Sequence, residues 1–280
     1  MLRGAPYSIC LIVGECQNIA EHIPELPEFV AADGPMDGCW HESFRIFARE
    51  NLGGNSFDIE KLKQVLDAKQ QGYPQTTNVI NYLVSHDRHH LLATASFWTL
   101  DPEAAFKRAK FGAVLLVTAL GIPMLWMGEE FGHSTRQTPN QSNKLQWSLL
   151  KNQPNHQLLA YYKHLILLRE NVPALYTKNI EFFHENPETK VLAYYRWSDE
   201  GTPPLVVANF LDIYLSGNSI PNFLAAGTWH EWMYNKIVEV GEEGFKFYWP
   251  EWSAQVFVLA PENLCLQADE RRSCRTVNYI

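Results

Sequence analysis

Two carboxylates follow apolar runs of the sequence at corresponding places. Glu15 comes shortly after residues 9–13, and Asp87 comes shortly after residues 79–84. Such a carboxylate is costly to bury beside strand residues unless it has a partner or a chemical role. Two of them suit acid/base chemistry on a glycosidic bond, in which one carboxyl group protonates the leaving oxygen. A helix cap or a loop salt bridge is the alternative for each, and the residues alone leave both interpretations open.

The segment 86–90 reads His-Asp-Arg-His-His and is dense in potential metal ligands. A metal centre is therefore a rival interpretation. It needs a second set of ligands, and none stands at a suitable distance in the sequence. Asp87 and His89 also cannot easily face one metal ion if the strand continues through them. We therefore predict no metal and no other cofactor.

A third candidate segment is 121–132, an apolar strand followed by the paired acids Glu129 and Glu130. These acids either cap a helix or line a cleft. Residues 111–128 carry no charge and are just long enough to span a bilayer. Pro123 interrupts them, because proline removes a backbone donor and disfavours a helical residue before it. We therefore interpret the stretch as a helix end followed by a buried strand, and expect no membrane contact.

The elements that must position these residues alternate along the first part of the chain. Apolar runs typical of buried parallel strands occur at residues 7–13, 79–84 and 122–127. Helical patterns occupy residues 41–52, 59–66, 101–120 and 156–170. Strands that alternate with helices up to about residue 172 indicate a parallel sheet or barrel.

From residue 180 onward the pattern changes to short runs separated by turn residues. These runs cover residues 191–197, 205–210, 246–249 and 254–259. The spacing predicts a small antiparallel β-domain, interpreted as a sandwich. We place the boundary at Pro173, which gives domains at 1–172 and 173–262 and a polar tail at 263–280.

Composition narrows the classes of function. The 280 residues carry 23 Lys+Arg against 31 Asp+Glu, a formal net charge of -8, which argues against nucleic-acid binding. Aromatic residues make up 13% of the chain, which suits either a large core or a site where sugar rings stack on aromatic side chains. The five cysteines form no C-x-x-C pair, so we expect reduced thiols and a cytoplasmic protein rather than a disulfide framework.

The motifs together resemble the second half of the barrel of glycoside hydrolase family 13, the α-amylase family. Ser85-His86-Asp87 follows an apolar strand, and residues 121–132 read GIPMLWMGEEFG. Residues 144–148, 165–175 and 252–257 are similar to segments that close the barrel and end the family's β-domain. The resemblance covers most of residues 8–260, with a likeness to 1,4-α-glucan branching enzymes. It implies the C-terminal half of a (β/α)8 TIM barrel, strands five to eight, followed by a small all-β sandwich.

The resemblance also implies roles for individual residues. Glu15 would be the general acid/base after the fifth strand, and Asp87 the third carboxylate, which stabilises the oxocarbenium-like transition state. His86 would hydrogen-bond the sugar next to the cleavage point. Trp40 and His41 either contact sugar or serve as a core aromatic and a helix-start histidine. The implied substrate is an α-1,4-glucan or a maltooligosaccharide, which is hydrolysed or transferred with retention.

The chain departs from the family at the nucleophile. The family's Gly-x-Arg-x-Asp and Asp-x-x-x-x-Asn-His sequences do not occur in it. Asp33 and Asp37 lie among Asp-Gly and Gly-Pro turn signals, and we interpret them as turn residues. We therefore expect a truncated chain, inactive or nearly so alone, that self-associates or pairs with a complementing N-terminal barrel half. The alternatives are a non-catalytic carbohydrate-binding fragment and one half of a split enzyme.

Overall fold

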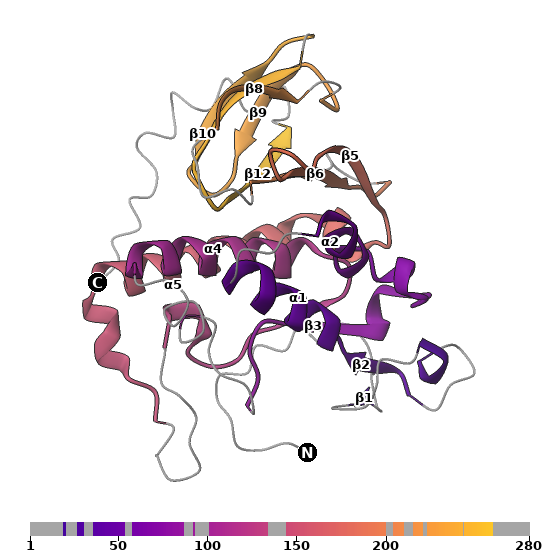
Figure 1. Ribbon diagram of the computed structural model, residues 1–280, viewed down its shortest axis with the longest axis vertical. Coiled ribbons are helices and arrows are strands. Elements are labelled where there is room, and N and C mark those ends of the chain that lie inside the picture. The colour runs from indigo at the N-terminus through magenta and orange to yellow at the C-terminus, as the bar shows by residue number, and fades with distance from the viewer. Residues whose placement is uncertain are drawn as a thin grey trace.

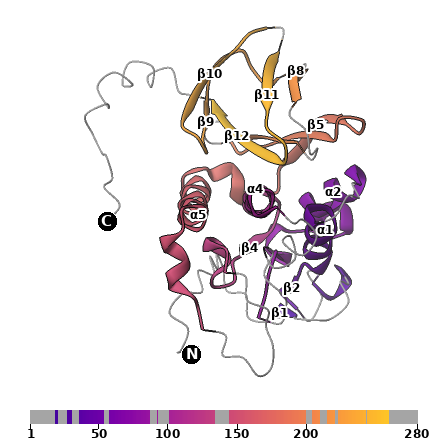
Figure 2. The same cartoon turned by 60° about the vertical axis from the view of Figure 1, so that its left-hand side comes forward.

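The computed structural model describes residues 19–20, 27–30, 36–53, 58–86, 92, 101–133, 144–199, 204–209, 215–220, 223–242 and 244–259. Its elements form layers (Figures 1 and 2): an antiparallel β-region, two long helices, and a parallel sheet with shorter helices beside it. The long helices are α4 (Pro102–Thr118) and α5 (Gln153–Asn171). They lie between the two β-layers and contribute to the core of both.

The parallel sheet contains four short strands in chain order. They are β1 (Ile19–Ala20), β2 (Gly38–Trp40), β3 (Val79–Tyr82) and β4 (Ile122–Met124). Each strand pairs in parallel with the next, so their carboxyl ends share one edge. The predicted strands at 79–84 and 122–127 are confirmed in shortened form, whereas the predicted strand at 7–13 lies outside the described residues. Strands β1 and β2 were not predicted.

Helices connect these strands at the places the sequence indicates. α1 (Glu42–Gly53) follows β2, and α2 (Ile59–Leu66) begins after Asp58, whose side chain accepts a hydrogen bond from the Lys61 N–H at 3.0 Å. Asp101 caps α4 in the same way, accepting from the Glu103 N–H at 3.0 Å. Short 3-10 turns complete this part of the chain, at Pro27–Phe29, Ala68–Gln71, Thr76–Asn78, Glu129–Phe131, Trp147–Lys151 and Pro173–Tyr176.

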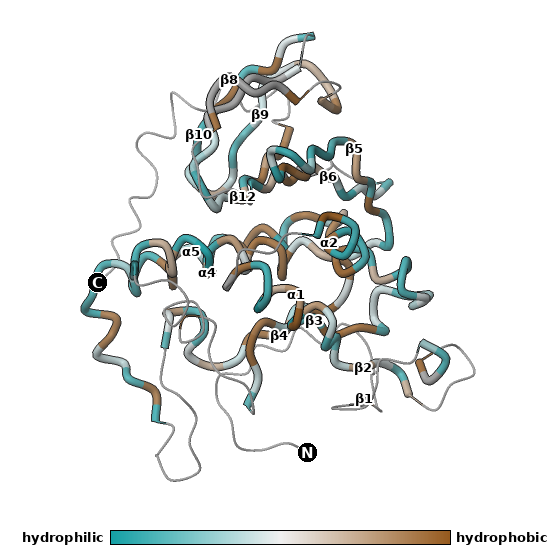
Figure 3. The backbone as a smooth tube through the Cα atoms, viewed as in Figure 1, coloured by the Kyte–Doolittle hydropathy of each residue, from teal (hydrophilic) through white to brown (hydrophobic). Residues whose placement is uncertain are grey.

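The second half of α4 is buried on all sides because it lies between the two β-layers. Its buried residues run from Phe111 to Thr118 without interruption, and the hydropathy colouring of Figure 3 shows the apolar stretch. This placement explains why residues 111–128 resemble a membrane segment. No helix in the described part of the chain is long and apolar enough to cross a membrane.

The antiparallel region consists of two sheets. Its strands are β5 (Ile180–Asn186), β6 (Val191–Arg196), β7 (Pro204–Asn209), β8 (Leu215–Ile220), β9 (Gly227–Glu231), β10 (Lys236–Val240), β11 (Phe245–Trp249) and β12 (Ser253–Leu259). Six of them form one sheet in the order β10-β9-β12-β7-β6-β5, and β11 pairs with β8. The predicted change to antiparallel strands is confirmed.

The two faces of the six-stranded sheet belong to different apolar clusters. One face contributes Val191 and Phe257 to a cluster with Leu215 and Trp249 of the two-stranded sheet. The other face packs on the helices in a cluster that runs from Phe44 through α4 and α5 to Val256. This core therefore continues across Pro173. The domain boundary remains a prediction, and the polar tail at 263–280 lies outside the described residues.

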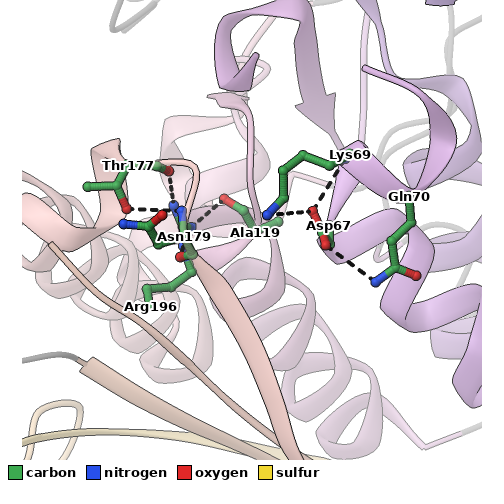
Figure 4. A network of polar contacts seen from close by, with 7 residues as sticks. All are labelled: Asp67, Lys69, Gln70, Ala119, Thr177, Asn179 and Arg196. Carbon is green, nitrogen blue, oxygen red and sulfur yellow. Dashed lines mark hydrogen bonds and ion pairs between the residues drawn. The ribbon is translucent and has the colours of Figure 1, made fainter. Parts of the chain in front are cut away.

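A buried arginine joins the helical and antiparallel parts (Figure 4). Arg196, at the end of β6, has no exposed surface and donates to backbone carbonyls from two segments, 118–119 and 175–179. Its partners are the carbonyl oxygens of Thr118, Ala119, Leu175, Thr177 and Asn179. Arg169 of α5 donates to the carbonyls of Val117 and Gly121 close by. The two side chains thus bond to carbonyl groups at and just after the C-terminus of α4, where the helix supplies no donors.

Candidate functional site

Aromatic side chains meet where β2, β3 and β4 end. Trp40 ends β2, Tyr82 ends β3, and His86 and Trp126 follow β3 and β4. The ring centroids form a chain, with Tyr82 to Trp40 at 5.1 Å, Trp40 to His86 at 5.8 Å and His86 to Trp126 at 6.0 Å. We call these four side chains the aromatic edge. In folds with parallel strands and helical connections, ligands bind at this carboxyl end.

Exposure along the aromatic edge increases from the sheet outward. Tyr82 is buried, Trp40 and Trp126 are half-buried, and His86 is exposed. The adjoining Met127 is 37% exposed. A set of half-buried aromatic faces with an exposed imidazole can take the C–H face of a sugar ring and supply a hydrogen bond beside it.

The charged pair Arg45–Glu42 contacts Tyr82, the buried member of the aromatic edge. Arg45 donates to both carboxylate oxygens of Glu42, and the Tyr82 hydroxyl also donates to Oε2 of Glu42. The hydrogen bond to Glu42 raises the pKa of Arg45, and burial raises the pKa of Tyr82. Both groups therefore keep their protons, and the bidentate contact holds the Glu42 carboxylate at one orientation.

His41 lies directly after β2 but points into the protein. It has no exposed surface, and its ring nitrogens contact Oδ1 of Asn81 at 2.6 Å and Oε1 of Gln71 at 2.8 Å. Its carbonyl accepts from the Arg45 N–H, so it also stands at the start of α1. This geometry matches the helix-start interpretation of His41. Its sugar-binding role stays a prediction.

The paired acids after β4 are held inside the loop that they begin. Glu129 is 5% exposed, and it accepts from the Tyr162 hydroxyl at 3.0 Å and from the Trp126 N–H at 3.4 Å. Burial raises the pKa of Glu129 to about 8, despite these two hydrogen bonds. Glu130 accepts from the Gly128 N–H at 2.8 Å, and burial raises its pKa as well. These acids shape the loop that presents Trp126.

The structure describes only some of the site residues that the sequence predicts. Trp40 and His86 are brought together, whereas Glu15 and Asp87 lie outside the described residues. Among the residues that the structure does describe, no three His, Cys, Asp or Glu side chains could hold a metal ion, and most of the segment 86–90 falls outside them. Sequence reasoning missed Tyr82 and Trp126, although each stands at or just after the end of a strand.

The chain is similar in sequence to several known proteins. No family model matches the chain. It is 27% identical to a cyclomaltodextrinase from Bacillus sp. over 154 residues, 54% of this chain and 26% of that enzyme. It is 28% identical to neopullulanase 2 from Thermoactinomyces vulgaris over 189 residues, 66% of this chain and 29% of that enzyme.

Solved structures show the same relationship at the level of the fold. An α-amylase from Geobacillus thermoleovorans, complexed with acarbose, superposes with a TM-score of 0.71 over 87% of this chain and 53% of that one, at 18% identity. These relatives and neighbours are enzymes of the α-amylase family. The match to the two curated relatives spans less than a third of their own length.

Proposed function

We propose that the carboxyl edge of the parallel sheet binds α-1,4-glucans as part of an α-amylase-type active site. The observation that carries this proposal is the aromatic edge, where Trp40, His86 and Trp126 adjoin on the side of the sheet that binds ligands in such folds. The relatives are α-glucan hydrolases, which supports the choice of ligand.

The proposal assigns the reaction to two carboxylates of the sequence, Asp87 and Glu15. Asp87 is the chain neighbour of His86, and it would stabilise positive charge on the sugar ring. Glu15 would protonate the leaving oxygen as the bond to the anomeric carbon breaks. A carboxylate nucleophile would form the glycosyl-enzyme bond, which water or a sugar hydroxyl then displaces with retention. Hydrolysis and branching differ only in that acceptor.

The nucleophile has no counterpart among the 280 residues, because Gly-x-Arg-x-Asp is absent from them. We therefore propose that strands β1 to β4 form part of a (β/α)8 barrel and that the nucleophile comes from barrel strands outside this sequence. A complementing barrel half would supply them. The same absence favours a second candidate function, a carbohydrate-binding fragment without turnover.

Binding of maltoheptaose, followed by titration calorimetry, tests the site. Trp126→Ala should weaken binding about tenfold, because a lost contact of ~1.4 kcal/mol changes the dissociation constant by that factor. Trp126→Phe should retain most of the affinity. Tyr176→Ala is the matched control, since Tyr176 is 40% exposed near Gly121 and Ile122 at the opposite edge of the sheet. Equal affinity for the wild type, Trp126→Ala and Trp40→Ala would overturn the proposal.

Turnover separates the two candidate functions. Reducing ends released from soluble starch, measured with the purified chain alone and with a supplied N-terminal barrel half, report catalysis. Activity that appears on complementation and disappears in Asp87→Asn supports the enzymatic role. Maltoheptaose binding without turnover in either case supports the carbohydrate-binding fragment.

A further inference from the structure

A large groove lies away from the aromatic edge, between the long helices and the antiparallel sheet. Its volume is about 780 Å3. It is lined by α4 and α5 near their N-termini, by the turn between β9 and β10, and by the start of β12. None of the four aromatic-edge residues lines it. The volume falls in the range of roughly 300–1,000 Å3 that is typical of small-molecule sites.

Unpartnered polar groups face this groove. Tyr161 is only 7% exposed, yet no described residue forms a hydrogen bond with its hydroxyl, whereas the adjacent Tyr162 hydroxyl is bonded to Glu129. Lys110 also lines the groove, with its ammonium 5.6 Å from the Tyr161 ring centroid, and it makes no ion pair with a described carboxylate. Both groups line the groove, so a ligand in it can bond to them without displacing a protein partner of the hydroxyl.

Charge in the groove is close to balanced. Lys107 is paired with both Glu103 and Glu251, which line the same groove. Lys110 and Lys236 add positive charge. The two carboxylates oppose a strongly anionic ligand, while the lysines disfavour an apolar one. A neutral ligand with many hydroxyl groups matches this mixture of donors and acceptors.

An exposed aromatic ring completes the groove. Tyr234 is 54% exposed in the turn after β9, and it lies on the lining together with Gln157 and Gln255. A tyrosine ring offers an apolar face and a polar end to one ligand. Planar amides offer a donor and an acceptor side by side. This is the set of groups that a sugar ring uses, with its C–H face on the aromatic and its hydroxyls on the amides.

We propose that this groove is a second oligosaccharide-binding site, separate from the aromatic edge, in which the Tyr161 hydroxyl and the Lys110 ammonium bond to sugar hydroxyls beside Tyr234. The choice of α-1,4-linked glucose as the sugar rests on the proposed function. The location of the site rests on the groove alone. A chain bound there would be held by both the helical layer and the antiparallel sheet.

The test uses the adjacent tyrosines as a matched pair. Maltoheptaose binding is titrated with the full chain carrying Trp126→Ala, so that the aromatic edge is weakened in every sample. In that background Tyr161→Phe should weaken the remaining binding about fivefold, through loss of one hydrogen bond. It should leave thermal stability unchanged, because the hydroxyl has no protein partner. Tyr162→Phe should lower stability and leave affinity unchanged. Tyr234→Ala should weaken binding about tenfold.

The outcomes separate the two proposals. Loss of all maltoheptaose binding in Trp126→Ala, together with unchanged affinity when Tyr161→Phe and Tyr234→Ala are made in the wild-type background, would overturn the second site and support the aromatic edge. Binding that only the groove variants weaken would support the second site and overturn the aromatic edge. Inorganic phosphate is titrated in parallel, and binding of phosphate in place of maltoheptaose would overturn the assignment of a neutral sugar.

Discussion

Oδ1 of Asn81 lies 2.6 Å from Nδ1 of His41, inside the parallel sheet. Both side chains have no exposed surface. Asn81 lies on β3, and its Nδ2 donates to the Leu120 carbonyl at 2.7 Å, immediately before β4. One amide thus ties the residue after β2 to the residues before β4. His41 and Asn81 hold the spacing of three strands whose ends carry the aromatic edge.

Asn81→Leu should lower the free energy of unfolding by about 2–4 kcal/mol, because it removes the buried amide that Nδ1 of His41 and the Leu120 carbonyl bond to. Urea denaturation measures the change. Asn171→Ala is the control, since Asn171 is exposed and bonds only to the Leu167 carbonyl of its own helix. If Asn81→Leu lowers the free energy of unfolding no more than Asn171→Ala does, the structural role of the Asn81 amide is contradicted.

Gly121→Ala should destabilise the protein by about 2–4 kcal/mol. Gly121 has a φ of +126°, and an added Cβ would lie 2.6 Å from Nδ2 of Asn81 and 2.9 Å from Cγ2 of Val79. Both a strained backbone and a clash with the buried amide result. Gly241→Ala is the matched control, because a Cβ there meets nothing within 4 Å. Comparable thermal unfolding of the two variants would argue against the packing seen around Gly121.

Arg196→Met should destabilise the protein by about 3 kcal/mol or more, since it removes the hydrogen bonds from Arg196 to five carbonyls. Burial lowers the pKa of Arg196 to about 9, so the position already disfavours charge and depends on these bonds. Arg49→Met on the exposed side of α1 serves as the control. Equal urea midpoints for the two variants would contradict the prediction that Arg196 stabilises the contact between the helical and antiparallel parts.

Local signals in the sequence are sufficient for the helices and for the change of strand pattern. α2 and α4 begin at the aspartates that cap them, and Gly72 adopts the left-handed conformation after the 3-10 turn that follows α2. Strand β2 was not predicted, because it has only three residues and follows turn signals in the sequence. Its pairing with β1 and β3 depends on segments that are distant in the chain.

The sequence predicts those site residues that follow a recognisable strand. It does not predict the residues that only tertiary packing brings to the site. Trp40 and His86 could be proposed from the sequence through the family resemblance, but the placement of Trp126 beside His86 depends on which strands are neighbours. The groove is even harder to predict from the sequence than the aromatic edge. Its lining comes from four segments between residues 102 and 255, and an unpartnered hydroxyl such as that of Tyr161 has no sequence pattern.

The buried carboxyl of Glu129 should make stability depend on pH. Its pKa is about 8 in the folded protein, compared with 4.5 for an ordinary glutamate. The folded state therefore holds a proton that the unfolded chain releases above pH 4.5. The stability that Glu129 contributes is fully present below about pH 4.5 and is lost as the pH rises to about 8, at up to about 1.4 kcal/mol per pH unit.

Glu129→Gln mimics the protonated carboxyl and should remove this dependence. Urea unfolding of both proteins at several pH values from 4.5 to 8 gives the difference in free energy of unfolding. We expect the wild type to lose stability relative to Glu129→Gln across that window. Glu231, whose pKa burial also raises, is present in both proteins and cancels in the difference. Parallel curves would mean that Glu129 is ionised in the folded protein, and that its hydrogen bonds to Tyr162 and Trp126 outweigh the effect of burial.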